Sequence, residues 1–383
     1  MHLCDIYTFS MSKYSPEIRN LVSKIVLTKH LPGGLRQKCI SMISRLIKVE
    51  QAGKFSEEFE SISQYIDWVC SIPWNVYSDE QIELDQARSI LDKYNYGLEQ
   101  VKQRVLEYLA VLKLKNFKAD TNRGSSDDIV ERMRTRRGNS SNAPVLCFVG
   151  IQGVGKTSIA KAIAIALRRE FIRIALGGLG SITEIRGLNR GEPNSEPGQI
   201  IKSLVRAKTM NPVILLDEID KVSSDSGLRA DVMAALLEIL DPEQNSSFMD
   251  KYIDYPVDLS RVIFITTANN LGGISAALLD RLEVIRFGSY SDNEKIIIAK
   301  NYLLPKVLEA AGLSPEVLSF EEDVWPLVIR PLGFDAGVRQ LERTLMDLAR
   351  KTALRIVQGQ GKKFVITKDN FRQFIPEDIG VYS

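Results

Sequence analysis

The residues with the most specific chemistry lie in a glycine-rich segment between an apolar run and an Ala-rich stretch. Apolar residues 145–149 precede the sequence G-I-Q-G-V-G-K-T at 150–157, and the Ala-rich stretch follows at 158–164. This is the pattern G-x-x-x-x-G-K-[ST] of a phosphate-binding loop between a strand and a helix. Glycines let N–H groups turn toward phosphate oxygens, and the following helix N-terminus attracts the same anion. The segment predicts a nucleotide site; an ordinary glycine turn is the less specific interpretation.

The side chains of this segment have distinct expected roles. Lys156 supplies a point charge for the outer phosphates, and Thr157 supplies a hydroxyl ligand for Mg²⁺. The predicted nucleotide-binding residues of the segment are Gly150, Ile151, Gln152, Gly153, Val154, Gly155, Lys156, Thr157 and Ser158.

A second chemical feature is a pair of acids at the end of an apolar run. Residues 213–216 read V-I-L-L and are followed by Asp217 and Glu218. Asp217 can hold Mg²⁺ through water, and Glu218 can activate a water for in-line attack on a γ-phosphate. The alternative is a helix N-terminus enriched in acids.

Three further polar residues complete the candidate machinery. Asn269 ends the strand after the acids, where its amide could orient the attacking water, although Asn also ends strands as a turn residue. Arg281 and Arg339 could stabilise charge on the transferring phosphoryl group. Taken in isolation, an arginine of this kind is more often a surface residue.

Composition and charge narrow the class of protein. The chain has 383 residues, 44% hydrophobic residues and a net charge of +2, with 50 basic and 48 acidic residues. This length allows two or three domains, and the charge balance gives no electrostatic case for nucleic acid as a main partner. No apolar run reaches the length of a membrane span. Four cysteines without close pairs and two histidines argue against a disulfide framework, a zinc site or a Ser-His-Asp hydrolase, and favour a reduced intracellular compartment.

Hydrophobic periodicity predicts helices at both ends of the chain and an α/β part between them. Residues 14–70 predict a helical bundle, or alternatively a partner-binding groove, and residues 83–114 carry two more helical patterns. The polar stretch at about 116–142 predicts a linker or surface loop. Its basic cluster at 132–137 is either a solvated loop or a nucleic-acid contact.

From Val145 onward, short β-branched runs alternate with helices, which predicts βαβ units and a parallel sheet. Residues 291–360 are helical again, with breaks expected at Pro305, Pro326 and Pro331. The predicted strands are 145–149, 171–176, 213–217, 262–266 and 284–287, with a terminal strand at 365–367.

From Tyr65 to about Ile379 the sequence resembles the ATPase part of Lon, the ATP-dependent protease, which is an AAA+ ring motor. The motifs that carry the resemblance are 65–68 (YIDW), 73–75 (PWN), 96–98 (YGL), 106–110 (LEYLA), 150–157, 175–178 (ALGG), 184–187 (EIRG), 216–221 (LDEIDK), 236–245 (LLEILDPEQN), 278–283 (LLDRLE), 304–306 (LPK) and 336–339 (AGVR). The resemblance implies an AAA+ P-loop ATPase fold, with a parallel sheet flanked by helices. It implies an N-terminal helical segment at 1–80, a large α/β subdomain at 81–288 and a helical lid at 289–383.

The resemblance also implies roles for the candidate residues. Lys156 and Thr157 match the nucleotide and Mg²⁺ contacts, and Asp217 and Glu218 match the Mg²⁺-water and catalytic pair. Asn269 matches the sensor on the sheet, Arg281 the arginine finger that reaches a neighbour's nucleotide, and Arg339 the lid arginine. Tyr96, Gly97 and Leu98 match the segment beside the adenine. ATP and Mg²⁺ are the implied cofactors, and a trans arginine implies a homohexameric ring.

The sequence departs from the family pattern at three places. Ile151 and Gln152 replace two prolines, which should not disturb backbone contacts to phosphate. Glu192 and Pro193 occupy the positions of the aromatic–aliphatic pair that grips substrate in the central pore, and an acidic pore offers little apolar surface. No match to the serine–lysine peptidase dyad is found.

The implied function is ATP-driven unfolding and threading of unfolded or damaged proteins for degradation, as in protein quality control. Peptidase activity is not expected from this chain, so a separate peptidase domain or chain is an implied partner. One alternative is an ATP-binding assembly or regulatory protein that no longer translocates substrate, which Glu192 and Pro193 motivate. Another is a nucleic-acid-remodelling ATPase, motivated only by residues 132–137. The polar insertion and the divergent pore loop favour an organelle matrix, with the peroxisome ahead of the mitochondrion.

Overall fold

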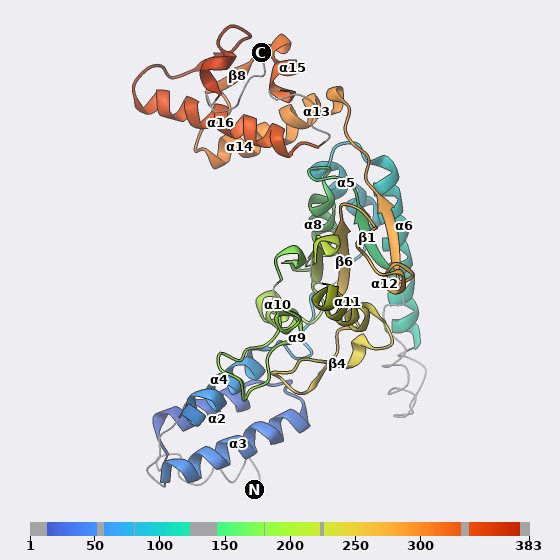
Figure 1. The fold of residues 1–383 in the computed structure, drawn as a ribbon, viewed down its shortest axis with the longest axis vertical. Helices are drawn as coiled ribbons and strands as arrows, with labels where there is room; N and C mark the ends of the chain where they lie inside the picture. The colour runs from blue at the N-terminus through green and yellow to red at the C-terminus, as the bar shows by residue number, and fades with distance from the viewer. Residues whose placement is uncertain are drawn as a thin grey trace.

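The computed structural model describes residues 14–51, 57–79, 81–122, 144–179, 181–222, 226–330 and 337–375. Figure 1 shows a long molecule with N-terminal helices at one end, a sheet-containing part in the middle and a mainly helical part at the other end. Among the described residues, no helix is both long and apolar enough to cross a membrane.

The N-terminal helices are α2 (Pro16–Leu27), α3 (Gly33–Gln51) and α4 (Glu57–Ser71). Pro16 stands in the first turn of α2, where its missing N–H costs nothing, and the Ser15 side chain caps that turn. Apolar residues of α2 at helical spacing are buried against the other two helices. The helix α4 ends at Ser71, before Pro73, because the residue that precedes a proline disfavours helical backbone angles.

The central sheet is parallel, and the predicted α/β class is confirmed. Its strands are β1 (Val145–Val149), β2 (Phe171–Ala175), β3 (Val213–Asp217), β6 (Ile263–Ala268) and β7 (Leu282–Arg286), in the order β2-β3-β6-β1-β7. Each strand lies within one to two residues of its predicted bounds. Because all five strands run the same way, their carboxyl ends meet at one edge of the sheet.

Helices cover both faces of the sheet, so neither face is solvated. The helices α5 (Leu84–Tyr94), α6 (Glu99–Asn122) and α8 (Lys156–Ala166) share a core with Leu146 and Phe148 of β1. The other face, with Cys147 and Val149, packs with α9 (Thr183–Arg186), α10 (Gln199–Ala207) and α11 (Ser226–Leu240). This alternation is the period-two pattern of a strand that is buried on both sides.

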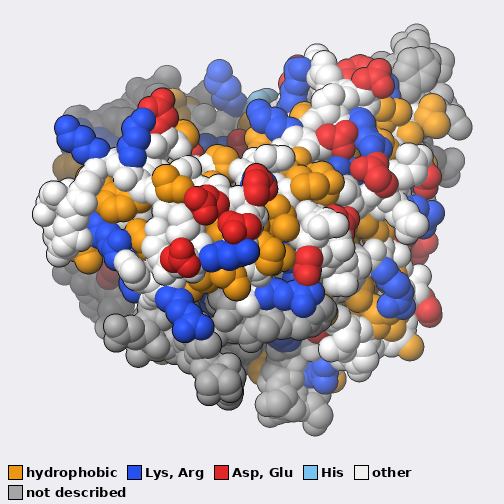
Figure 2. Space-filling view, turned by 90° about the horizontal axis from the view of Figure 1, so that it is seen from above, with side chains coloured by type: hydrophobic (Ala, Val, Ile, Leu, Met, Phe, Trp, Pro, Cys, Tyr) orange, Lys and Arg blue, Asp and Glu red, His pale blue; other side chains and the backbone are white. Residues whose placement is uncertain are grey.

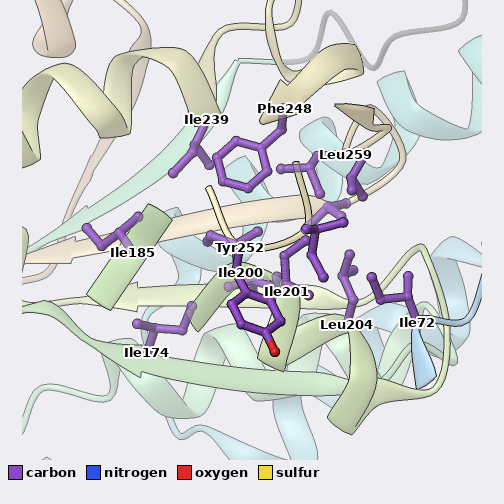
Figure 3. Close-up of a cluster of buried hydrophobic side chains, with 14 of the residues drawn as sticks. Ile72, Ile174, Ile185, Ile200, Ile201, Leu204, Ile239, Phe248, Tyr252 and Leu259 are labelled. Atoms are coloured by element: carbon purple, nitrogen blue, oxygen red, sulfur yellow. The ribbon is translucent and has the colours of Figure 1, made fainter. Parts of the chain in front are cut away.

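The N-terminal helices share the core of this second face. Figure 3 shows Ile72, which follows α4, beside Leu204 of α10, in the same cluster as Ile200 and Ile201. A short hairpin of β4 (Phe248–Met249) and β5 (Pro256–Val257) adds Phe248 to the same cluster. Apolar burial therefore joins the N-terminal helices to the sheet part.

The polar stretch begins later than the sequence predicts. The backbone of α6 stays helical to Asn122, so residues 116–122 are not part of a loop. A helix that is already nucleated extends through polar residues at little cost, because each added residue gains a hydrogen bond. Residues 123–143, including the basic cluster at 132–137, lie outside the described residues.

The C-terminal part has its own core. It contains α13 (Asp292–Ile298), α14 (Leu304–Ala310), α15 (Trp325–Ile329), α16 (Arg339–Val357) and a pair of parallel strands, β8 (Leu318–Phe320) and β9 (Phe364–Ile366). The short helix α12 (Ala276–Leu279) precedes β7. Seen from this end in Figure 2, acidic and basic side chains are intermixed and form no field of one sign.

Two prolines of this part stand at the starts of helices, where the sequence predicts breaks. Pro305 stands in the first turn of α14, and a π-helical turn at Ala299–Leu303 joins that helix to α13 without a break. The wider turn absorbs the proline, which has no N–H to donate. Pro326 likewise starts α15, and Pro331 lies outside the described residues.

Candidate active site

The glycine-rich loop joins β1 to α8 at the carboxyl edge of the sheet. Gly153 and Gly155 have φ angles of +80° and +92°, which side chains rarely adopt. A Cβ on Gly155 would also lie 3.2 Å from the hydroxyl of Tyr290. That hydroxyl donates to the carbonyl of Val154 at 3.1 Å. The loop is therefore enclosed on this side, and glycine is required.

Lys156 is the buried cation of the site, with 9% of its surface exposed. Its ammonium donates to the carbonyls of Gly150 and Ile151, and to Oδ1 of Asn269 at 3.0 Å. Burial lowers the pKa of Lys156, and the neighbouring carboxylates of Asp217 and Asp220 oppose that shift. Asn269 is 113 residues away in sequence, and the parallel sheet brings it to the loop.

Thr267 of β6 links the two acids at the end of β3. Its hydroxyl donates to Oδ1 of Asp217 and accepts from the backbone N–H of Glu218 at 2.9 Å. Glu218 has a φ of +59°, a left-handed conformation that a non-glycine residue adopts only when its surroundings hold it. Its carboxylate lies 3.1 Å from the ammonium of Lys221. Thr267 thus holds the carboxylate of Asp217 and the backbone of Glu218.

Asp220 positions the end of the neighbouring strand. Its Oδ2 accepts the backbone N–H groups of Asn269 at 3.1 Å and Asn270 at 3.3 Å. This carboxylate was not among the predicted site residues. Its spacing in the sequence L-D-E-I-D-K at 216–221 was visible, but nothing local showed that it would cap the end of β6.

Arg173 of β2 is a second residue that the sequence reasoning missed. Its Nε donates to Oδ2 of Asp217 at 2.7 Å, and its Nη2 lies 2.6 Å from the same oxygen. The available signal was a charged residue in the middle of the apolar strand F-I-R-I-A at 171–175. The pairing of β2 with β3 was needed to give that charge a partner.

The N-terminus of α16 lies directly on the glycine-rich loop. The backbone N–H of Val338 donates to the carbonyl of Gly153 at 3.1 Å, and Nη1 of Arg339 donates to Oε1 of Gln152 at 3.3 Å. A Cβ on Gly337 would lie 2.2 Å from the carbonyl of Gln152. The structure therefore brings Arg339 to the predicted loop, through contacts that span 187 residues.

The segment Tyr96-Gly97-Leu98 also lies beside this loop. Gly97 and Leu98 both have positive φ angles, and the Leu98 side chain is 3.7 Å from where a Cβ on Gly155 would be. Tyr96 packs edge-on against Tyr302, with ring centroids 6.5 Å apart. The segment thus fills the space between the loop and the C-terminal helices.

Arg281 is directed elsewhere within its own chain. Its Nη1 donates to Oδ2 of Asp241 at 2.8 Å, just after the end of α11. This contact differs from those of Lys156, Asn269 and Arg339, all of which reach the loop or its neighbours. The structure therefore does not bring Arg281 together with the other predicted residues.

The site has the donors that Mg²⁺ prefers. Thr157 offers an exposed hydroxyl at the start of α8, and Asp217 offers a buried carboxylate. Within the described part of the chain, no cluster of three or more His, Cys, Asp or Glu side chains could hold a metal alone. This set fits an ion that takes its remaining ligands from phosphate oxygens and water.

The loop at 187–198, which carries Glu192 and Pro193, is anchored at its base. The buried carboxylate of Asp250 accepts N–H groups from Gly198, Tyr252 and Ile253 at 2.8–3.0 Å. Burial raises the pKa of Asp250 to about 6, although these hydrogen bonds oppose the shift.

The same loop also contacts the N-terminal helices. The guanidinium of Arg190 lies 4.3 Å from the ring centroid of Tyr65 in α4, a cation–π distance. The tip residues Glu192 and Pro193 are exposed.

Comparison with known proteins agrees with this geometry. The model of the ATPase family associated with various cellular activities (AAA) matches residues 146–290. The parallel sheet, the loop before α8 and the acids ending β3 thus define an AAA ATPase, a class that binds ATP. The model of the Lon protease AAA+ ATPase lid domain matches residues 309–365. The chain belongs to the Lon type of AAA+ ATPase.

Its relatives extend this similarity to most of the chain. It is 42% identical over 345 residues to the Lon protease of Halothermothrix orenii, covering 90% of this chain and 40% of the relative. It is 41% identical over 366 residues to Lon protease 1 of Bacillus subtilis, covering 96% and 44%. For Lon protease 2 of Thermus thermophilus the identity is 43% over 345 residues, covering 90% and 41%. The chain thus spans about 40% of the length of these relatives.

The relatives overturn one expectation from the sequence. An organelle matrix was expected, with the peroxisome ahead of the mitochondrion, but these relatives are proteins of bacteria, which have neither organelle. The expectation was wrong because it rested on a polar insertion and a divergent loop. Neither feature is an address that a targeting receptor reads.

Proposed function

We propose that this chain is the ATP-hydrolysing motor part of a Lon-like protease, which unfolds and moves protein substrates for degradation. The observation that carries the proposal is the convergence on one loop of a buried lysine, the strand-end Asn269 and the N-terminus of α16. The division into 1–80, 81–288 and 289–383 remains part of the proposal. So do unfolded or damaged proteins as substrates, and a peptidase domain or chain as partner.

In this proposal each residue has one task. The loop from Gly150 to Ser158 binds the phosphates, with Lys156 released from its carbonyl contacts to meet them. Thr157 and Asp217 hold Mg²⁺, which offsets negative charge on the phosphates when bound. The segment Tyr96-Gly97-Leu98 lies against the adenine.

The remaining residues act on the attacking water and the transferring group. Glu218 accepts a proton from the water, and the amide of Asn269 orients it. Arg339 stabilises developing charge from within the same chain. Arg281 acts on the nucleotide of a neighbouring subunit, which requires a closed homohexameric ring. Its contact with Asp241, away from its own loop, supports a role outside its own site.

The proposal is tested by Glu218→Gln, which keeps the size of the side chain but removes the proton acceptor. Hydrolysis of Mg²⁺–ATP should fall by at least about a hundredfold, because general-base catalysis contributes that much or more. Nucleotide binding, followed by the fluorescence of a labelled ADP, should persist. Unchanged turnover in this variant would contradict the assignment of Glu218.

The residues at the tip of the loop at 187–198 motivate a second candidate function. Glu192 and Pro193 are exposed where the family has its apolar gripping pair, so the chain could bind and hydrolyse ATP without moving substrate. ATP-dependent unfolding of a tagged protein separates the two functions. An assembly or regulatory ATPase would leave the tagged protein folded, and ATP turnover would not respond to it.

A further inference from the structure

Arg173 of β2 lies against the carboxylate of Asp217 at the end of β3. In the part of the chain that the structure describes, strand β2 stands at the edge of the sheet and pairs with β3. Arg173 lies opposite Leu215, and Ala175 opposite Asp217. Side chains two residues apart on a strand share a face. Arg173 therefore lies on the same face as Asp217 and reaches along β3 to the carboxylate at its end.

The contacts hold both oxygens of that carboxylate. Two nitrogens of the Arg173 guanidinium lie 2.6 and 2.7 Å from Oδ2. Oδ1 is occupied by the hydroxyl of Thr267. Charge-assisted hydrogen bonds of this kind are the strongest in proteins and fix the orientation of the acceptor. Donors of the chain itself thus hold both oxygens of Asp217.

The two partners differ sharply in exposure. The Asp217 side chain is 8% exposed, whereas the Arg173 side chain is 54% exposed. A buried carboxylate needs a counter-charge, because it cannot regain hydration where it lies. An exposed guanidinium is rehydrated as soon as it moves away. Arg173 is therefore the partner that can leave, provided that another cation takes its place.

The nearby Lys156 does not fill this role. Its ammonium is engaged by the loop carbonyls and by Asn269. Arg173 is also absent from the set of residues assigned above to phosphate, base or water. Among the described residues, the close polar contacts of Arg173 are with Asp217.

We propose that Arg173 acts through Asp217, as the exchangeable counter-ion of its carboxylate. It neutralises the carboxylate in the nucleotide-free site and moves into solvent when the Mg²⁺–nucleotide enters. The inference rests on the proposed nucleotide site and adds a consequence to it. The apparent affinity for Mg²⁺ includes the cost of displacing Arg173, so this residue sets the Mg²⁺ concentration at which the site fills.

The test uses the full chain and Arg173→Gln, which keeps a polar side chain of similar reach without the charge. Binding of a fluorescent ADP is followed as Mg²⁺ is titrated. The Mg²⁺ midpoint should fall about three- to tenfold, the order expected for losing a charge-assisted contact. Arg173→Lys keeps the charge but not the paired donors. Its Mg²⁺ midpoint should therefore lie between those of the parent chain and Arg173→Gln. Arg206→Gln, an exposed arginine of α10, is the matched control and should leave the midpoint unchanged.

A thermal measurement separates exchange from a fixed structural role. Without Mg²⁺ and nucleotide, Arg173→Gln should melt at a lower temperature than the parent chain, because Asp217 has lost its counter-charge. With saturating Mg²⁺–ADP that difference should vanish, since Arg173 is displaced in the parent chain as well. A difference that persists, or a Mg²⁺ midpoint that is unchanged or raised, would overturn the inference while leaving the nucleotide site intact. Absence of nucleotide binding by the parent chain would overturn both.

Discussion

At the scale of single residues, the site depends on side chains that serve two neighbours at once. Thr267 donates to Asp217 and accepts from the backbone of Glu218, and Asp220 accepts two N–H groups at the end of β6. Such groups are costly to leave unpaired in a buried place. They therefore hold the acids in one arrangement before any ligand arrives.

Burial of its carboxylate makes Asp250 a pH-sensitive anchor for the loop at 187–198. Its pKa is raised from 3.8 to about 6 by burial, so the protonated form is favoured in the folded chain. The stability from this neutral form is complete below pH 3.8 and is lost as the pH rises through about 6. The loss is roughly 3 kcal/mol at most, because one unit of pKa is about 1.4 kcal/mol.

Asp250→Asn removes this titration and keeps the size of the side chain. The free energy of unfolding of the parent chain, relative to the variant, should decrease between pH 4 and pH 6 and level off above that range. Urea unfolding followed by circular dichroism at several pH values measures the difference. Parallel pH profiles for the two proteins would contradict the assigned pKa.

At the scale of elements, the decisive contact is the N-terminus of α16 against the glycine-rich loop. Neither element forms the proposed site alone, because the loop carries the proposed phosphate donors and α16 carries Arg339. The close approach is possible only because Gly153 and Gly337 have no side chains. The two glycines thus set the position of the C-terminal part relative to the sheet.

Gly153→Ala tests this contact. A Cβ there would lie 2.9 Å from the backbone nitrogen of Arg339, at a φ of +80°. The free energy of unfolding should fall by roughly 1–3 kcal/mol, and the affinity for fluorescent ADP should fall with it. Gly288→Ala, where a Cβ would meet nothing within 4 Å, is the control and should change little. Equal behaviour of the two variants would show that α16 does not depend on this approach.

At the scale of the whole molecule, shared cores and several close contacts join the parts. The N-terminal helices share a core with one sheet face, and Arg190 lies against Tyr65 beside the same junction. The C-terminal part has a separate core and meets the sheet part at the loop. The contact of α16 with the glycine-rich loop therefore links the C-terminal part directly to the proposed nucleotide site.

The proposed ring can be tested by mixing two variants that are inactive when each is assembled alone. Glu218→Gln and Arg281→Ala should each be nearly inactive alone. In an equal mixture, some interfaces combine an intact Glu218 with an intact Arg281 from the next subunit. Random assembly restores at most about a quarter of the parent activity. ATPase assays of the mixture, with assembly checked by size-exclusion chromatography, measure this recovery, and none would contradict a trans role for Arg281.

Much of the fold and the centre of the site were accessible from the sequence. The predicted phosphate-binding loop is a single sequence segment, and its glycines indicate the backbone conformation that the proposed site needs. The strands are short apolar runs, and Asp217 and Glu218 directly follow one of them. Such local features are encoded within a few residues, where backbone sterics and burial patterns act directly.

The tertiary structure alone decided which distant side chains meet. Arg173 contacts Asp217, which is 44 residues away in sequence, and Arg339 contacts Gln152, which is 187 residues away. These contacts depend on strand order, register and the docking of α16, which no single segment encodes. The sequence by itself determined a nucleotide-binding loop with acids nearby. The fold decided that a buried carboxylate has an exposed arginine as its counter-ion, because pairing across the sheet sets both the distance and the burial.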